Sequence, residues 1–376
     1  MCTQTRTHHI HLFFRPWRSH GVVISPLFQK PPARPAQGGS PFKPPAASNP
    51  QDSFRSSEPI QAFKPPHLHQ PAPTEGPKVE TIPYTSSAAI PNLAAFQAIQ
   101  SLISDTPEGL RQLQQLAEQG KLSGNTLENL HNLTEQPRAK GLDGAQLTRE
   151  TLAILSSPDS NIWQSSRFTC GATNLERQWA DQPERFSQVV ENLTGLQAST
   201  TLISGYTLQR AQGSTDEDGS GRSSVDRVLQ SSIMASAGAA RGDYSVETDR
   251  FGNDPEGGLK IAEIAGITAA AQNRSQVVIA YDSKSARAAQ ELIGKMEPGE
   301  SFQAAMTNWE GKEHMLLFQG GQDGSARYFD PADRSQHTIP LRDFLWKTQY
   351  LVLPEPMAAR VSFGPESIHS KAQIGA

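Results

Sequence analysis

Proline is distributed very unevenly along this chain of 376 residues. Seventeen of the 28 prolines lie at or before Pro91, among Gln, Ser and Ala and with few aliphatic residues. Such a segment buries too little apolar surface to offset the entropy lost on ordering it. We therefore expect residues 1–90 to form a disordered proline-rich arm, and the folded core to come from the remainder.

Two patterns in the arm are typical of partner binding. The tetrapeptide Phe-Lys-Pro-Pro occurs at residues 42–45 and again at 63–66, and residues 32–35 have the PxxP spacing of a polyproline II ligand. Composition favours a semi-rigid linker. A docking arm for a PxxP-binding partner is the alternative.

Charge and hydropathy exclude several classes of protein. The formal net charge is −4, whereas nucleic-acid binding needs a basic stripe, so we expect no nucleic-acid partner. Apolar stretches such as 261–271 stop near half of the roughly 20 residues of a spanning helix, so no membrane contact is expected. The N-terminus lacks the apolar core of a secretion signal, which predicts a cytoplasmic protein. Delivery by a dedicated effector-secretion system would also suit the polar arm.

Cysteine usage limits the chemistry further. Cys2 and Cys170 are the two cysteines of the chain, which excludes a disulfide scaffold and a multi-Cys zinc site. The acidic, glycine-rich stretch 213–221 is expected to be an exposed loop, and its carboxylates do not match a calcium-loop spacing. We expect no metal and no cofactor.

Periodicity divides the rest of the chain into α and β regions. Apolar residues at helical spacing, with Pro, Asp and Gly at the ends, predict four helices within 91–158, read as a small helical module. Residues 159–356 follow as a larger domain, and 357–376 as a C-terminal tail. Further helices are expected near 170–180, 181–196, 225–235 and 285–293, and an antiparallel sheet from strands near 277–281, 302–309, 314–318, 326–330 and 350–353. The fold class is therefore α+β.

Cys170 has the setting of a nucleophilic thiol. It precedes Gly171 and Ala172 at the start of a predicted helix, where the helix dipole favours a thiolate and small residues leave room for a substrate carbonyl. A buried, inert core cysteine is the alternative. Gln164, six residues upstream on a loop, could supply its amide beside the Cys170 N–H as a two-donor oxyanion hole.

Two residues of the predicted hairpin complete a triad. His314 begins one strand and Asp330 ends the next, and a turn centred near residue 322 makes them approximate cross-strand neighbours. A carboxylate placed there can hold one imidazole nitrogen while the other serves the thiol. His337 is a rival base, but it lies in a polar stretch with no predicted strand, and Asp323 and Asp333 are rival carboxylates in loop-like surroundings.

The order Gln164, Cys170-Gly171, a distant His314 and an Asp330-Pro331 after a hairpin resembles the papain-like cysteine peptidase superfamily. It is most similar to bacterial branches, the double-glycine-leader peptidases and the papain-like effector proteases, over roughly residues 160–355. The resemblance implies a papain-like fold, with a helical subdomain carrying Cys170 and a sheet carrying His314 and Asp330. It also implies Gln164 as oxyanion donor and a protein or peptide as substrate.

Three functions remain open on this basis. The leading hypothesis is a cysteine peptidase working through Cys170, His314, Asp330 and Gln164. The same groups would serve a glutamine deamidase or a transglutaminase-type acyltransferase. A non-enzymatic interaction protein, binding partners through the arm and the helical module, is the third.

Overall fold

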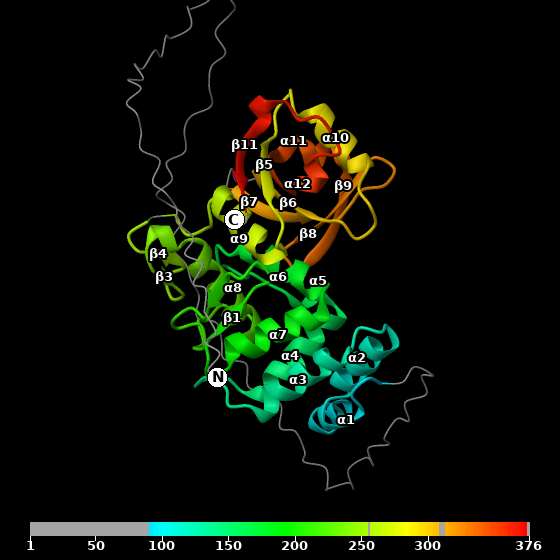
Figure 1. The fold of residues 1–376 in the computed structure, drawn as a ribbon, viewed down its shortest axis with the longest axis vertical. Coiled ribbons are helices and arrows are strands. Elements are labelled where there is room, and N and C mark those ends of the chain that lie inside the picture. The colour runs from blue at the N-terminus through cyan, green and yellow to red at the C-terminus, as the bar shows by residue number, and fades with distance from the viewer. Residues whose placement is uncertain (1–89, 255, 308–312, 374–376) are drawn as a thin grey trace, which may run out of the picture. The chain divides into compact units, whose positions relative to one another are not determined.

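The computed structural model describes residues 90–254, 256–307 and 313–373. The proline-rich arm, its repeated tetrapeptide and its PxxP sequence lie outside these residues, as does the turn expected at residues 310–311. The described part combines helices with an antiparallel sheet, so the predicted α+β class is confirmed (Figure 1). No helix in the described ranges is long and apolar enough to cross a membrane.

The four helices predicted in the first region are present, and local capping explains where they begin. Asn92, Ser123 and Asp143 each accept a hydrogen bond from a backbone N–H in the first turn, while Pro107 occupies the first position of its helix, where no N–H is needed. The helices are α1 (Leu93–Leu102), α2 (Pro107–Glu118), α3 (Gly124–Glu135) and α4 (Gly144–Ser156).

These helices share one hydrophobic core with the helices that follow. Leu130 of α3, Leu152 of α4, Leu175 and Phe186 are fully buried in the same cluster. The boundary expected between residues 158 and 159 falls inside a short helix, Pro158–Asn161, which belongs to this continuous run. The helices concerned are α5 (Pro158–Asn161), α6 (Cys170–Ala180), α7 (Pro183–Thr194) and α8 (Ser224–Ala237).

Within the described residues, seven strands form one antiparallel sheet in the order β11-β5-β10-β6-β7-β8-β9. Two short two-stranded ladders, β1 (Ser199–Thr201) with β2 (Thr207–Gln209) and β3 (Tyr244–Ser245) with β4 (Arg250–Phe251), lie outside it. The strands of the large sheet are β5 (Gln276–Ala280), β6 (Phe302–Thr307), β7 (Glu313–Phe318), β8 (Ser325–Asp330), β9 (Ser335–Pro340), β10 (Thr348–Pro354) and β11 (Ile368–Ala372).

Both edge strands of this sheet were missed by the sequence prediction. The polar stretch around His337 is strand β9, which pairs with β8 from Ser325 to Asp330, so the expectation that no strand positions His337 was wrong. Ile368–Ala372, expected in a tail, pairs with β5. An edge strand has one partner and little buried surface, and its sequence therefore lacks the apolar alternation on which the prediction relied.

Helices cover the two faces of the sheet. On one face Ile264 of α9 (Ile261–Gln272) packs with Val278, Met315 and Val352, and Cys170 lies against this cluster. On the other face α10 (Ala286–Gly294) and α11 (Leu341–Lys347) cover a stack that includes Phe318. Figure 1 shows α6 between the sheet and helices α1–α4. The remaining elements are α12 (Glu355–Ala358) and the 3₁₀ turns Ala239–Arg241 and Pro365–Ser367.

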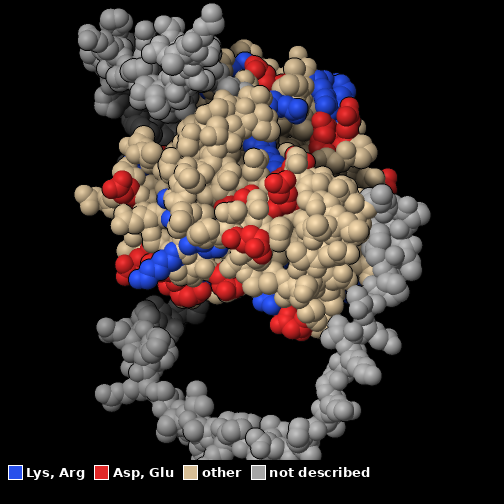
Figure 2. Space-filling view, turned by 60° about the horizontal axis from the view of Figure 1, so that its bottom comes forward, with Lys and Arg blue, Asp and Glu red and all other residues tan. Residues whose placement is uncertain are grey.

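Charged side chains of both signs occur on the face of the molecule drawn in Figure 2. On the face drawn in Figure 2, Lys and Arg side chains alternate with Asp and Glu and do not gather into one basic stripe. The described residues on this face thus lack the continuous positive potential that draws in a phosphate backbone.

Candidate functional site

Cys170 is the first residue of α6 and is partly exposed. The helix contacts β7, the strand that carries His314, and also α8 and α9. Gly171 explains how α6 comes so close to α9: a Cβ at this position would lie 2.8 Å from Ile264 Cδ1 and 2.9 Å from its Cγ1. The small residue after the cysteine, expected to make room for a substrate, thus serves close helix packing.

His314 and Asp330 are in direct contact. The His314 Nε2 and Asp330 Oδ1 atoms are 2.8 Å apart, and both side chains are largely buried. The pairing of β7 with β8 joins Leu317 to Phe329 and Phe318 to Tyr328. Continuing this register sets Asp330 opposite Leu316, so residues 314 and 330 are cross-strand neighbours offset by one side-chain repeat, and their contact is diagonal.

The contacts of His314 shift the pKa of both members of the pair. Burial alone would lower the pKa of His314, but hydrogen bonds to Asp330 and Cys170, with the charges of both groups, outweigh it and raise the pKa to about 10. Burial alone would raise the pKa of Asp330, yet the hydrogen bond and the charge of His314 lower it below its ordinary value. Asp330 is therefore ionised at neutral pH and accepts from the protonated Nε2 of His314.

The thiol of Cys170 approaches the same imidazole. A hydrogen bond between the Cys170 and His314 side chains is among the causes that raise the pKa of the histidine. Because Nε2 is engaged by Asp330 Oδ1, Nδ1 is the ring nitrogen left for the thiol. The structure thus brings together three of the four residues named from the sequence: a thiol, an imidazole and a carboxylate in series.

Gln164 lies beside this group, on the loop that leads to α6. Its backbone N–H donates to the Pro331 carbonyl over 3.0 Å, so it is fixed next to Asp330. Its side-chain Nε2 donates to the Arg167 carbonyl over 3.1 Å, while its Oε1 is buried and makes no hydrogen bond. The side chain therefore lies over the loop toward Arg167, and Nε2 has a second N–H that could donate a hydrogen bond to a ligand oxygen.

A tryptophan ties the same loop to the sheet. Trp163 Nε1 donates to the Ala332 carbonyl over 2.9 Å, and the Arg334 guanidinium lies 4.1 Å from the Trp163 ring centroid. Together with the Gln164 N–H, these contacts hold the loop before Cys170 against the turn after Asp330. The sequence analysis did not predict this role of Trp163, although an aromatic residue directly before the candidate oxyanion donor could have indicated it.

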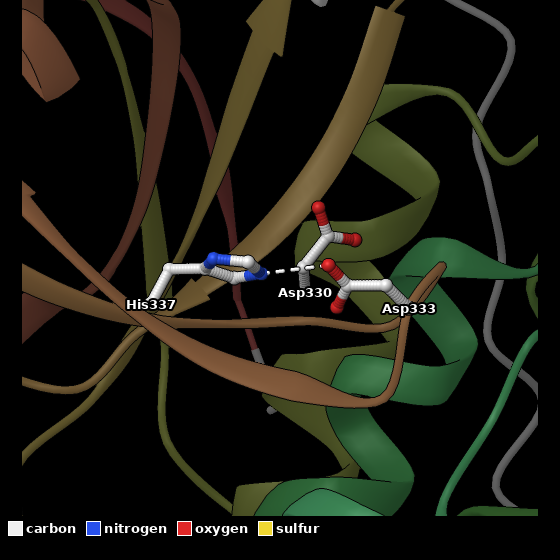
Figure 3. A group of neighbouring side chains, drawn as sticks. All are labelled: Asp330, Asp333 and His337. Atoms are coloured by element: carbon white, nitrogen blue, oxygen red, sulfur yellow. Dashed lines mark hydrogen bonds and ion pairs between the residues drawn. The ribbon is translucent and has the colours of Figure 1, made fainter.

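A second histidine–aspartate pair lies next to the first. His337 points from β9 toward Asp333, with 2.7 Å between His337 Nε2 and Asp333 Oδ2, and Asp330 lies beside them (Figure 3). The ligand atoms of these three residues lie within 4.8 Å of one another, close enough to hold a cation. Internal hydrogen bonds account for the group without one, because Asp330 accepts from His314 and Asp333 from Ser335. His337 also stacks on Tyr328.

A buried polar network beneath Cys170 was not anticipated. Glu176 of α6 and Asp226 of α8 are completely buried, and Glu176 Oε1 and Asp226 Oδ1 make no hydrogen bond. Burial raises the pKa of both carboxyls, and the charge of Asp226 adds to the rise at Glu176. Gln230 donates to Glu176 over 2.8 Å. Asp226 and Gln230 stand four residues apart in α8, whose apolar residues predicted a helix, and this spacing could have marked a polar buried face.

Comparison with models of protein families, with curated proteins and with solved structures found no match for this chain.

Proposed function

We propose that this protein is a thiol enzyme that cleaves amide bonds through Cys170, His314 and Asp330. The observation that carries the proposal is the position of His314, whose Nε2 contacts the Asp330 carboxylate at 2.8 Å while its pKa is raised in part by the Cys170 thiol. An imidazole held by a carboxylate on one side and a thiol on the other is the arrangement that activates a sulfur nucleophile.

The proposed reaction proceeds in two stages. With its proton already held by His314, the Cys170 thiolate attacks the amide carbon, and the resulting oxyanion accepts hydrogen bonds from the Cys170 N–H and the Gln164 amide. His314 then passes the proton to the leaving amine nitrogen as the C–N bond breaks and a thioester forms. In the second stage His314 deprotonates a water molecule that attacks the thioester, which releases a carboxylic acid and the thiol. Asp330 holds the imidazolium throughout.

The substrate class follows from the chemistry and from the resemblance to papain-like cysteine peptidases. We propose a protein or peptide substrate and a papain-like arrangement of the α+β fold. Incubation with a mixture of unfolded proteins followed by mass spectrometry separates the reactions. New chain ends indicate a peptidase, whereas a mass gain of about one dalton on a glutamine indicates a deamidase, because replacing NH by O changes the mass by that amount.

Labelling by an epoxide or vinyl sulfone tests the proposed activity without knowledge of the substrate. We expect Cys170 to react faster than Cys2 in the same chain by about a hundredfold, because the His314–Asp330 pair would serve its sulfur. H314A should abolish this advantage, whereas H337A removes the neighbouring histidine–aspartate pair and should leave the labelling unchanged. Equal labelling of the two cysteines, or equal effects of H314A and H337A, would favour a non-enzymatic interaction protein.

A further inference from the structure

Gln230 of α8 is the point at which four separate segments meet in the buried network. Its Nε2 donates to the Trp163 carbonyl over 3.1 Å and to Glu176 Oε2 over 2.8 Å. Its Oε1 accepts from Thr169 Oγ1 and from Arg222 Nη1, both over 2.9 Å. The side chain is fully buried, and each hydrogen-bonding position of its amide is used.

The partners fix which way this amide faces. A backbone carbonyl, here that of Trp163, can only accept, so the NH₂ group must face it, and the Arg222 guanidinium can only donate, so the oxygen must face that side. A flipped amide would place acceptor against acceptor and donor against donor in a buried space, at a cost of several hydrogen bonds. Gln230 is consequently locked in one orientation.

Two of these partners directly precede the two proposed oxyanion donors. Trp163 is followed by Gln164, and Thr169 is followed by Cys170. Gln230 holds the backbone of the first and the hydroxyl of the second. Thr169 is also the N-cap residue of α6, yet its side chain makes no capping hydrogen bond, and its hydroxyl is turned toward Gln230, to which it donates. At most N-caps of this type, the side chain accepts a hydrogen bond from an N–H group in the first turn. The Thr169 side chain makes no such bond at the start of α6.

We propose that Gln230 is a positioning residue that sets the separation of the Gln164 amide from the Cys170 N–H, and keeps Thr169 from capping α6. This inference rests on the function proposed above, because it concerns the oxyanion hole of the same reaction. Gln230 touches neither substrate nor the reacting atoms. Its effect should therefore be on the stabilisation of the oxyanion and not on the reactivity of the sulfur.

Two small reagents separate these effects at Cys170. With 4-nitrophenyl acetate the thiolate attacks the ester carbonyl, the tetrahedral oxyanion collapses, 4-nitrophenolate leaves, and the acetyl group stays on sulfur as a thioester. With iodoacetamide the thiolate displaces iodide to give a thioether, and no oxyanion forms. Acylation is followed by nitrophenolate release, with the rate of C170A subtracted, and alkylation by mass spectrometry of the Cys170 peptide. The ratio of the two rates reports the oxyanion hole alone.

We expect Q230M, which keeps the shape and removes the four hydrogen bonds, to lower acylation by about ten- to a hundredfold and to leave alkylation within about twofold. T169V removes a single hydroxyl, and we expect it to lower acylation by about three- to tenfold. If Q230M does not fold, the result for T169V decides the test. T169S should restore wild-type acylation. S231A is the matched control, because Ser231 is the next residue of α8, is fully buried and has a hydroxyl with no hydrogen bond.

The outcomes distinguish the inference from the proposed function. Wild-type protein in which Cys170 reacts with both reagents no faster than a free cysteine would overturn both. A reactive wild type whose acylation survives Q230M and T169V would overturn the role of Gln230 and leave the proposed function standing. Equal loss of acylation and alkylation in a folded variant would also overturn it, because Gln230 would then act on the thiol.

Discussion

His314 Nε2 and Asp330 Oδ1 meet at 2.8 Å across strands whose ladder ends before either residue is reached. The last paired residues toward this end are Leu317 and Phe329. No further paired positions follow toward His314, whose imidazole contacts the Asp330 carboxylate and the Cys170 side chain at the start of α6. A diagonal pair beyond the end of the ladder therefore holds the base through Nε2 and leaves Nδ1 for the thiol.

Removal of the Asp330 charge should shift the titration of His314 to lower pH. In the wild-type protein we expect the imidazolium to persist until about pH 10. D330N removes the negative charge that opposes the effect of burial on His314. The midpoint of the His314 titration should therefore move down by about one pH unit or more. NMR titration of histidine-labelled protein from pH 5 to 11 measures this, with H314Q assigning the resonance and D333N as the control. A wild-type midpoint near the ordinary 6.5 would contradict the prediction.

The same pair should make stability fall in alkaline solution. The folded-state pKa of His314 lies above its ordinary value of 6.5, so the stabilisation is complete below that pH and is lost as the pH rises through about 10. Urea unfolding at pH 7, 9 and 10.5 should show this decline in the wild type, and a smaller decline in D330N. Parallel curves for the two proteins would show that the pair contributes nothing to folding.

Neutralising the buried carboxyl pair should stabilise the protein at neutral pH. Because burial raises the pKa of Glu176 and Asp226 in the folded state, stability is lost as the pH rises above their ordinary values. E176Q keeps an oxygen for Gln230 and removes the buried charge, so it should unfold at a higher urea concentration than the wild type at pH 8. The gain should vanish near pH 4. E118Q, at an exposed site on α2, is the control and should change little.

A methyl group at Gly171 should disturb the packing of α6 on α9. Its Cβ would lie 2.8 Å from the end of the buried Ile264 side chain, so G171A should destabilise by about 1–3 kcal/mol. I264A leaves a cavity and should cost about 2–5 kcal/mol by itself. Because the new methyl group would enter that cavity, the double variant should be less destabilised than the sum. Additive urea-unfolding energies would mean that the two residues do not conflict.

Loss of the indole hydrogen bond should loosen the loop before Cys170. W163F keeps the ring and removes the donor to the Ala332 carbonyl, at a cost of about 0.5–1.5 kcal/mol. Hydrogen–deuterium exchange of the Gln164 N–H, which donates to Pro331, should quicken by about three- to tenfold. R334A removes only the guanidinium over the ring and should have the smaller effect. Unchanged exchange in W163F would show that the indole does not hold the loop.

The sequence predicted those parts of the structure that leave a local pattern. Apolar spacing and caps located α1–α4, and the glycine-rich turn 320–324 placed His314 and Asp330 on adjoining strands. The turn is centred one residue later than expected, with Asp323 in the left-handed region at φ 51°, and this moved the pairing by one side-chain repeat. A turn residue that tolerates positive φ without being glycine gives little warning of this.

Features made by distant segments could not be predicted in this way. The hydrogen bonds of Gln230 reach Trp163, 67 residues earlier, and Glu176, 54 residues earlier, and no periodicity relates such positions. Strand β9 was missed because an edge strand buries little apolar surface. The papain-like arrangement and the chemistry of Cys170 stay predictions.

The contacts within the proposed triad differ greatly in the sequence separation of the residues that make them. His314 and Asp330 are 16 residues apart on one hairpin, whereas Cys170 comes from 144 residues before His314. Short loops close at small entropic cost and long ones at larger cost, so the hairpin can form while the rest of the chain is still unfolded. We therefore expect a nascent or partly unfolded molecule to hold its thiol in an inert state, and reactivity at this sulfur to report that the whole domain has been assembled.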